Sequence, residues 1–416
     1  MRAMSKYVIV GNGVASAGCI EGIRSVDNQG EITVLSQEKH PVYSRPLISY
    51  YLEGKTTLEK MNYRPADFYE KNNAELVYDT ATSLDVKSAS VTLSGGKKLE
   101  FEKLCLATGS SPFVPPMEGL EKVKNKFTFM TMDDSLALEK VLTKDSRVLI
   151  VGAGLIGLKC AEGILERVAS VTVCDLADRV LSSILDSECA AVMQAHLEKQ
   201  GITFLLSDSA VSFDKNKAKM KSGKIVEFDI LVLAVGVRAN TRLAKEAGAD
   251  TDRGIIIDTQ MQTTLENVYA AGDCTQGFDS STGENRVLAI LPNAYMQGFC
   301  AGVNMAGGES SITNAIPMNS IGFFGLHCTS AGSYFAQGEG EIFEEKQNGG
   351  IKRLYIKDDK LTGYIIIGDV TGAGIYTSLV REKTDLCEVN VDKLKKDATL
   401  AMFLPDTRRK KLGGVV

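Results

Sequence analysis

The sequence predicts an α/β protein with two doubly wound domains, followed by a C-terminal α+β domain. Two observations predict the first part: a strand, a glycine-rich turn, a helix and a second strand occur within residues 7–35, and the same series returns within residues 147–174. The third observation is a change of pattern after about residue 313, where alternating strand signals such as 354–356 and 364–367 dominate. A length of 416 residues suits two or three domains.

The composition narrows the classes of function. The chain is 44% hydrophobic and 24% charged, with a formal net charge of −5, so its overall charge does not favour nucleic acid as a partner. A basic run, 408–411, closes the chain and is interpreted as a solvated tail rather than a docking site. No apolar stretch has the length of a membrane span, and the nine cysteines form no C-x-x-C pair. We therefore expect no membrane partner and a reducing, cytoplasmic location.

The first unit has the form of a dinucleotide-binding βαβ motif. A buried strand, 7–10, leads into Gly11-Asn12-Gly13, and small residues follow in a helix. In such a turn the first glycine permits the bend, the second lets the backbone approach a pyrophosphate, and the third lets the helix pack close to the strand. Here the third position is Ser16, which is still small. The residues predicted to contact the dinucleotide are Gly11, Gly13, Val14, Ala15 and Ser16, with Glu38 as the ribose ligand.

The second unit satisfies the pattern completely. Gly152, Gly154 and Gly157 follow the strand 147–151, and Asp175 ends the next strand, at the spacing expected for an acid that binds a ribose 2′-hydroxyl. A carboxylate there repels a 2′-phosphate and so favours NADH over NADPH. Leu155 and Ile156, which begin the helix, complete the predicted site. Two such units in one chain indicate two Rossmann-like domains, and FAD with NAD(H) is the economical pair for hydride transfer.

Further segments carry a family resemblance. Ala107-Thr108-Gly109 and residues 269–273 resemble two signatures of the glutathione-reductase-like flavoproteins, in which the aspartate at the position of Asp273, after Gly272, holds the ribityl chain of FAD. Residues 40–49 resemble the Y-x-R-P-x-L-S segment of NADH–rubredoxin reductases, ferredoxin reductases and the N-terminal part of nitrite reductases.

That resemblance implies further cofactor contacts. It places Arg45 and Pro46 by the adenine or pyrophosphate of FAD, and it places Asn293 and Ala294 in a helix whose N-terminus points at the flavin pyrimidine. Ferredoxin reductases often carry a flavin-side lysine where this chain has Tyr50. Ala81 and Gly236 complete the predicted cofactor-binding residues.

The resemblance also shows what the chain lacks. Disulfide reductases of the superfamily carry a cysteine pair after the first unit, and peroxidase or oxidase relatives carry a single reactive cysteine there, whereas residues 40–54 contain no cysteine. Cys19, Cys105, Cys160 and Cys174 are interpreted as small buried hydrophobic residues, and a packing role is expected for Cys274 as well. No metal site or catalytic side chain is predicted, because the flavin carries the chemistry.

We therefore expect an FAD-binding domain over residues 1–112 and 243–312, an inserted NAD(H)-binding domain over 113–242, and an α+β domain over 313–416 for partner docking or dimerisation. The expected function is an NADH-dependent FAD oxidoreductase that reduces a small electron-transfer protein such as rubredoxin without a cysteine relay. A reductase component for nitrite reductase or an iron–sulfur partner, an NADH oxidase, and a non-enzymatic flavoprotein sensor remain open, as does a homodimer.

Overall fold

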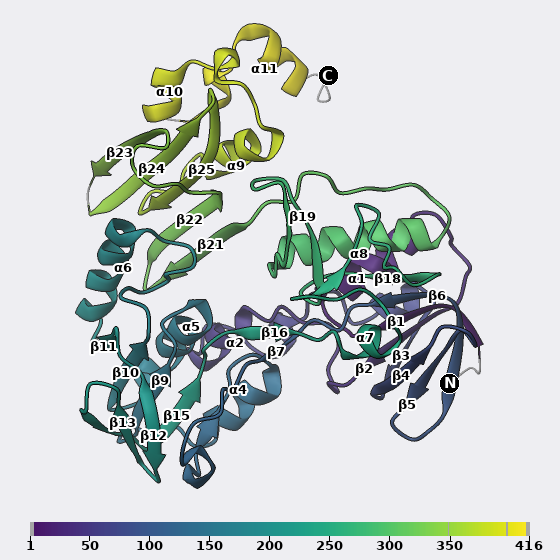
Figure 1. Ribbon diagram of the computed structural model, residues 1–416, viewed down its shortest axis with the longest axis horizontal. Coiled ribbons are helices and arrows are strands. Elements are labelled where there is room, and N and C mark those ends of the chain that lie inside the picture. The colour runs from purple at the N-terminus through teal and green to yellow at the C-terminus, as the bar shows by residue number, and fades with distance from the viewer. Residues whose placement is uncertain (1–3, 348, 397, 413–416) are drawn as a thin grey trace.

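Three sheets organise the molecule (Figure 1). The computed structural model describes residues 4–347, 349–396 and 398–412. Two of the sheets are largely parallel and carry the two βαβ units, and the third is antiparallel. The predicted fold class, two Rossmann-like units and a C-terminal α+β domain, is confirmed.

The first sheet has the strand order β3-β2-β1-β6-β5-β4, and β18 pairs with β6 beside this path. Its strands β3, β2, β1, β6 and β18 run parallel, so their carboxyl ends meet at one edge, whereas β4 and β5 are antiparallel additions. The strands are β1 (Met4–Val10), β2 (Ile32–Ser36), β3 (Ala74–Tyr78), β4 (Ala81–Asp85), β5 (Ser90–Leu93), β6 (Lys98–Leu106) and β18 (Val268–Ala270).

Helices α1 (Val14–Arg24) and α8 (Leu291–Met305) lie side by side against this sheet (Figure 1). Glycines bring their backbones together: a Cβ on Gly22 would lie 2.2 Å from the Phe299 carbonyl oxygen, and one on Gly302 would lie 2.1 Å from the Cys19 carbonyl oxygen. The small residues of α1 therefore allow close packing against a helix that is far away in the sequence.

The second sheet has the order β11-β10-β9-β15-β8 and is parallel throughout. A small antiparallel sheet, β12-β13-β14, lies beside it. The elements are β8 (Lys126–Phe127), α4 (Met132–Glu139), β9 (Arg147–Val151), α5 (Leu155–Ile164), β10 (Ser170–Asp175), α6 (Ser187–Lys199), β11 (Ile202–Leu206), β12 (Ala210–Asp214), β13 (Lys217–Met220), β14 (Ile225–Glu227) and β15 (Ile230–Leu233).

The chain leaves the first sheet and returns to it through a two-stranded ribbon, β7 (Ser110–Pro112) paired with β16 (Val237–Ala239). Asn240 links the outgoing and the returning crossing of the chain, which contain β7 and β16. Its side-chain Nδ2 donates to the Thr108 carbonyl oxygen at 2.8 Å, and the Thr108 hydroxyl donates to the Asn240 backbone carbonyl oxygen at 2.7 Å. The outgoing and returning strands are thus held side by side.

Shorter elements complete the two α/β layers and their connections. They are α2 (Leu47–Leu52), η1 (Glu59–Met61), α3 (Phe68–Lys71), η2 (Leu120–Lys122), η3 (Leu165–Arg167), α7 (Arg242–Glu246), β17 (Ile255–Ile256), β19 (Thr275–Asp279) and β20 (Glu284–Arg286).

The third sheet has the order β21-β22-β25-β24-β23 and is antiparallel. One face shares a hydrophobic core with the second sheet and α6, and the other is covered by α9 and the C-terminal helices (Figure 1). Its elements are β21 (Met318–Phe323), β22 (Leu326–Gly332), β23 (Glu341–Gln347), β24 (Gly350–Lys357), β25 (Lys360–Ile367), α9 (Ala373–Glu382), η4 (Leu386–Glu388), α10 (Val391–Lys396), η5 (Leu400–Met402) and α11 (Pro405–Leu412). None of the helices in the described residues combines the length and apolar character that crossing a membrane requires.

Candidate functional site

The first glycine-rich turn lies at the carboxyl end of β1. Gly11 has φ +115°, and a Cβ there would lie 2.0 Å from the Ala107 carbonyl oxygen, so only glycine fits. Gly13 is the N-cap of α1, and a Cβ on it would meet no protein atom within 4 Å. The open space in front of Gly13 and the N–H groups that begin α1 together form a cradle suited to a pyrophosphate.

Three predicted residues converge beside this cradle. A Cβ on Gly272, which has φ +83°, would lie 3.0 Å from the Ala15 Cβ and 3.5 Å from the Ala294 Cβ. The half-buried Asp273 follows, and its Oδ2 accepts a hydrogen bond from the Ser110 hydroxyl at 3.2 Å. Burial raises the pKa of Asp273, because the carboxylate lacks the solvation it has in water. Such a carboxylate is ready to accept hydrogen bonds from the hydroxyls of a ligand.

The N-terminus of α8 contributes Asn293 at its first turn. Asn293 is buried, its Nδ2 donates to the Ile316 carbonyl oxygen at 3.5 Å, and its Oδ1 has no hydrogen-bond partner in the structure. A buried acceptor without a partner is costly, so this atom fits a ligand that donates to it. With the open cradle at Gly13 and the carboxylate of Asp273, it shows that the residues present fit FAD.

Glu38 and Arg45 pair with each other. The Arg45 guanidinium bonds to Glu38 Oε1, while the Tyr43 hydroxyl donates to Glu38 Oε2 at 2.6 Å. Tyr43 also accepts from the Met132 backbone N–H at 2.9 Å, which links this segment to α4 of the second α/β layer. Both carboxylate oxygens of Glu38 are thus engaged by Tyr43 and Arg45, a pairing that the sequence did not predict.

The second glycine-rich turn repeats the geometry of the first. Gly152 has φ +117° and approaches the Ala234 carbonyl oxygen, to which a Cβ would come within 2.2 Å. A Cβ on Gly157 would lie 2.0 Å from the Gly152 carbonyl oxygen, whereas one on Gly154, the N-cap of α5, would meet no protein atom within 4 Å. The half-buried Leu155 and Ile156 begin the helix. This open turn fits a second pyrophosphate.

Asp175 ends β10 and closes the same turn. Its Oδ2 accepts from the Ala153 backbone N–H at 2.6 Å, and its Oδ1 accepts from the Ala177 N–H at 2.8 Å. The neighbouring Leu176 is 69% exposed. Asp175 therefore lies at the mouth of the second turn, where the sequence places a ribose ligand.

The remaining predicted residues lie on the crossings and at a sheet edge. Gly109 (φ +64°) and Gly236 (φ +111°) precede β7 and β16, and both face open space. Thr108 belongs to the Asn240 tie between the crossings. Ala81 begins β4 and is buried in the first core, so its contact with a cofactor stays a prediction.

Helices α2 and α5 bring the two units face to face. A Cβ on Gly163 of α5 would lie 2.7 Å from the Ser49 carbonyl oxygen of α2. One helical turn away, Arg167 donates to the Leu52 carbonyl oxygen at 3.0 Å. The helix that begins at the second turn is thus packed directly against the segment that follows Arg45 and Pro46 of the first unit. When both are bound, NADH supplies a hydride and FAD accepts it.

The cysteines are placed as buried hydrophobic residues, with Cys387 as the exposed exception. Cys274, next to Asp273, donates to the Leu106 carbonyl oxygen at 3.3 Å, and burial raises its pKa to about 11. It is therefore a protonated thiol at neutral pH rather than a nucleophile. Among the residues that the structure describes, no cluster of side chains could hold a metal ion.

His196 of α6 lies against the third sheet. It is half-buried, and its Nε2 lies 3.0 Å from the Phe323 carbonyl oxygen. The third sheet packs over this face of α6, which the helix pattern alone does not reveal. Lys159 and Glu162, which were also not predicted, meet the same part of the third sheet.

Comparison with protein families gives two matches. Residues 5–298 match the pyridine nucleotide-disulphide oxidoreductase family, and residues 317–384 match the C-terminal domain of rubredoxin NAD⁺ reductase. The first match covers both glycine-rich turns and Asp273, and the second begins at β21.

Among curated proteins, the chain is 32% identical to the epsilon subunit of NADH-dependent phenylglyoxylate dehydrogenase from Aromatoleum evansii, over 92% of this chain and 93% of that protein. It is also 32% identical to an NADH oxidase from Methanocaldococcus jannaschii, over 87% of each. It is 30% identical to the nitrite reductase of Bacillus subtilis, of which it covers 48%.

Solved structures show the same fold. The model superimposes on a putidaredoxin reductase in its covalent complex with putidaredoxin, with a TM-score of 0.86 at 23% identity, covering 95% of this chain and 96% of that one. For NADH:rubredoxin oxidoreductase from Clostridium acetobutylicum the TM-score is 0.75 at 22% identity, with coverages of 92% and 96%.

The family match spans the two turns that the geometry singles out, and members of this family depend on FAD and NAD(H). The fit of the residues to both dinucleotides and the whole-length similarity to NADH-dependent enzymes lead to the same conclusion. The chain belongs to the pyridine nucleotide-disulphide oxidoreductase family and is an FAD- and NAD(H)-dependent oxidoreductase with a C-terminal domain that matches that of rubredoxin NAD⁺ reductase.

Proposed function

We propose that this enzyme passes electrons from NADH through FAD to a small one-electron carrier protein such as rubredoxin. The observation that carries the proposal is the placement of the thiols. Residues 40–54 hold no cysteine, the cysteines near the turns are buried, and the exposed Cys387 lies in the third domain, where a hydrogen bond with Asp385 raises its pKa. Without a thiol relay, electrons leave from the flavin directly to the partner.

The proposed organisation assigns residues 1–112 and 243–312 to FAD, 113–242 to NAD(H) and 313–416 to the partner or to a second copy of the chain. The match of residues 317–384 to a rubredoxin reductase C-terminal domain supports the carrier. The proposed FAD ligands are the predicted residues around Gly13, Arg45, Asp273 and Asn293, and the proposed NAD(H) ligands are those around Gly154 and Asp175.

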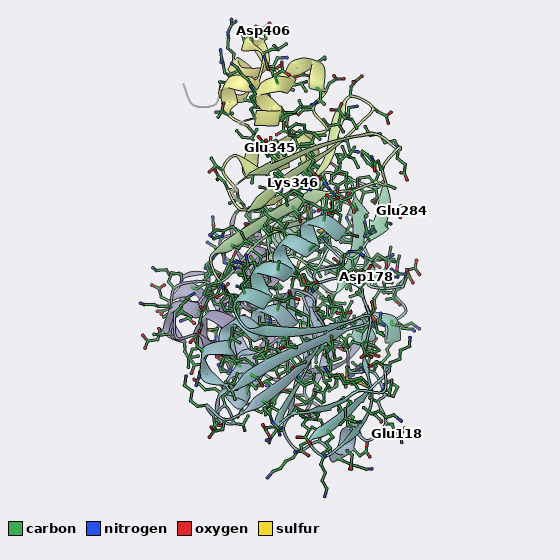
Figure 2. The ribbon with its side chains drawn as sticks, turned by 90° about the vertical axis from the view of Figure 1, so that its left-hand side faces the viewer. Glu118, Asp178, Glu284, Glu345, Lys346 and Asp406 are labelled. Atoms are coloured by element: carbon green, nitrogen blue, oxygen red, sulfur yellow. The ribbon has the colours of Figure 1, made fainter. Side chains whose placement is uncertain are left out.

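The C-terminal basic run contributes little to docking at the flavin. It belongs to α11, where Lys411 pairs with Glu382 and Arg409 pairs with Asp406. Figure 2 shows Asp406 at the opposite end of the molecule from Glu118, which follows β7 and lies beside the second α/β layer. The charges of Lys411 and Arg409 are thus already paired within the C-terminal part of the chain.

A second candidate is a reductase subunit that feeds a larger enzyme. Its support is the similarity to the epsilon subunit of phenylglyoxylate dehydrogenase and to an assimilatory nitrate reductase electron transfer subunit from Bacillus subtilis, at 31% identity over 88% of this chain and 48% of that protein. In that case the acceptor is an iron–sulfur centre on a partner subunit.

The test is an anaerobic assay in which NADH, the enzyme and rubredoxin are mixed and the bleaching of rubredoxin is followed. We expect bleaching far faster than free FAD supports, and unchanged after alkylation of accessible thiols. Loss of turnover that follows alkylation, with FAD still bound, contradicts the absence of a thiol relay. Bleaching no faster than with free FAD, together with rapid reduction of oxygen or of an iron–sulfur protein, eliminates rubredoxin and leaves the reductase assignment standing.

A further inference from the structure

A buried ammonium group lies where all three parts of the molecule meet. Lys159 is on α5, one helical turn after Leu155, and its side chain is 14% exposed. Its Nζ donates to Glu162 Oε2 at 2.5 Å and to the Gly322 carbonyl oxygen at 2.9 Å, and it lies 4.6 Å from the centre of the Tyr50 ring. A buried charge persists only when its partners compensate the loss of water, and these three do.

The same cluster fixes the tip of the β21–β22 hairpin. Glu162, with a side chain 6% exposed, accepts from the Phe324 backbone N–H through Oε1 at 2.6 Å. His196 of α6 meets the Phe323 carbonyl oxygen at 3.0 Å. Three side chains of the second α/β layer thus bind backbone groups of three consecutive residues of the third sheet.

Lys159 also faces the junction of the two dinucleotide units. Tyr50 lies on α2, which begins directly after Arg45 and Pro46, and α2 packs on α5 through the contact between Gly163 and Ser49. Hydride transfer requires the reactive ends of the two dinucleotides to meet between these units. Lys159 brings a cation to this region from the NAD(H) side.

We propose that Lys159 is a positioning residue for hydride transfer, holding Tyr50 and the hairpin tip around the junction and setting its charge. In the transfer, a C–H bond of the dihydronicotinamide breaks and its hydrogen passes to the flavin with the electron pair, so NADH is oxidised and FAD is reduced by two electrons. Negative charge thereby reaches the flavin. A fixed cation in a water-poor junction stabilises that charge more than a hydrated one does.

The Lys159–Glu162 pair offers a test, because removing either charge should shift the reduction potential of the flavin in opposite directions. Removing the ammonium makes the junction more negative, which disfavours reduced flavin, whereas neutralising Glu162 makes it more positive, which favours reduced flavin. A purely structural role of the pair gives no reason for opposite shifts. The proposal concerns the reductive half of the reaction and holds for any electron acceptor.

The experiment measures the two-electron midpoint potential of the FAD-loaded protein by anaerobic dye-coupled titration, which needs neither NADH nor an acceptor. Lys159→Met should lower the potential by about 30 mV, which is a tenfold change in the reduction equilibrium for two electrons. Lys159→Arg, which keeps the charge, should have the wild-type potential, and Glu162→Gln should have a higher potential. Arg167→Met serves as the matched control, because Arg167 also joins this layer to α2 but at the Leu52 end.

Thermal unfolding of each variant shows whether it folds. If Lys159→Met does not fold, the other two variants still test the proposal. The midpoint potential should rise in Glu162→Gln and should stay at the wild-type value in Lys159→Arg. Equal or same-direction shifts in Lys159→Met and Glu162→Gln, or a shift in Arg167→Met as large as that in Lys159→Met, overturn the proposal. A protein without bound flavin instead contradicts the cofactor assignment.

Discussion

The two βαβ units share a plan but differ in what surrounds them. In the second unit, glycine is required at position 157 because a Cβ would meet the Gly152 carbonyl oxygen at 2.0 Å, and Asp175 bonds to the N–H of its own turn. In the first unit, Ser16 takes the corresponding place with its Oγ buried and unpaired, and Glu38 is engaged by the neighbouring Arg45 and Tyr43. The acid of the second unit is therefore held by its own turn, whereas the acid of the first unit is held by the segment that carries Tyr43 and Arg45.

The largest expected effects come from substitutions at Gly13 and Gly154, which should each affect a different dinucleotide. Gly13→Val and Gly154→Val each place a Cβ where no protein atom lies within 4 Å. We expect Gly13→Val to weaken FAD binding at least ~100-fold, about 2.7 kcal/mol, and Gly154→Val to raise the KM for NADH by a similar factor while the protein stays yellow. Flavin absorbance and NADH–dye reductase kinetics measure the two effects. Loss of FAD from Gly154→Val rather than from Gly13→Val reverses the comparison.

The next largest effect concerns Asp273, the carboxylate beside the first glycine-rich turn. Asp273→Ala should weaken FAD binding by ~1.5–3 kcal/mol, the range for hydrogen bonds to a charged group. Fluorescence titration of the apoprotein with FAD measures it, and full affinity in the variant contradicts the assignment of Asp273.

The same residue should set a pH dependence of the apoprotein. Because burial raises the pKa of Asp273 in the folded state, the folded protein binds its proton more tightly than the unfolded chain does. Wild-type stability should therefore fall, relative to Asp273→Asn, as pH rises from below the ordinary carboxyl pKa to above the raised one. Urea unfolding of both apoproteins across that window checks the sign, and a gap that widens toward acid pH contradicts it.

The acid of the second unit should act on specificity. Wild type should use NADH at least ~10-fold better than NADPH, about 1.4 kcal/mol, because the Asp175 carboxylate repels a 2′-phosphate. Asp175→Asn should narrow the ratio of kcat/KM values while keeping an acceptor for the Ala153 N–H. If wild type prefers NADPH, Asp175 does not have this role.

The smallest effect tests the serine of the first unit. Ser16 Oγ is buried without a partner, so Ser16→Ala should leave the free energy of unfolding unchanged or raise it by less than about 1 kcal/mol. Ser36→Ala is the matched control, because the Ser36 hydroxyl donates to the Glu38 carbonyl oxygen at 2.6 Å, and it should cost about 1 kcal/mol. Denaturant unfolding compares them. A larger loss in Ser16→Ala than in Ser36→Ala implies that Ser16 has a partner when FAD is bound.

The sequence predicted what local patterns encode. Glycines at 11, 13, 152, 154 and 157 and the strands around them follow from backbone geometry over a few residues, so both turns lie where the pattern placed them. The convergence of Asp273 and Asn293 on the first turn came from family resemblance, since nothing local in the sequence joins positions so far apart.

The contacts between the domains were not predictable in this way. Pairing of Glu38 with Arg45, the Asn240 tie, and the hold of Lys159, Glu162 and His196 on the hairpin tip depend on how whole layers pack. A signal existed for one of them: two charged residues, Lys159 and Glu162, interrupt an otherwise small and apolar helix. Such residues are buried only when they have a specific partner.

The ribbon formed by β7 and β16 also fixes where the inserted segment is attached. Because Ser110 pairs with Ala239, the chain leaves and re-enters the first sheet at neighbouring points. The two ends that the first sheet must receive are therefore held in place by the ribbon itself, whereas the orientation of residues 113–236 depends on their contacts with α2 and with the third sheet. A replacement of the inserted segment would thus leave the path of the chain through the first sheet unchanged, but it would uncover the face of the third sheet that packs on α6.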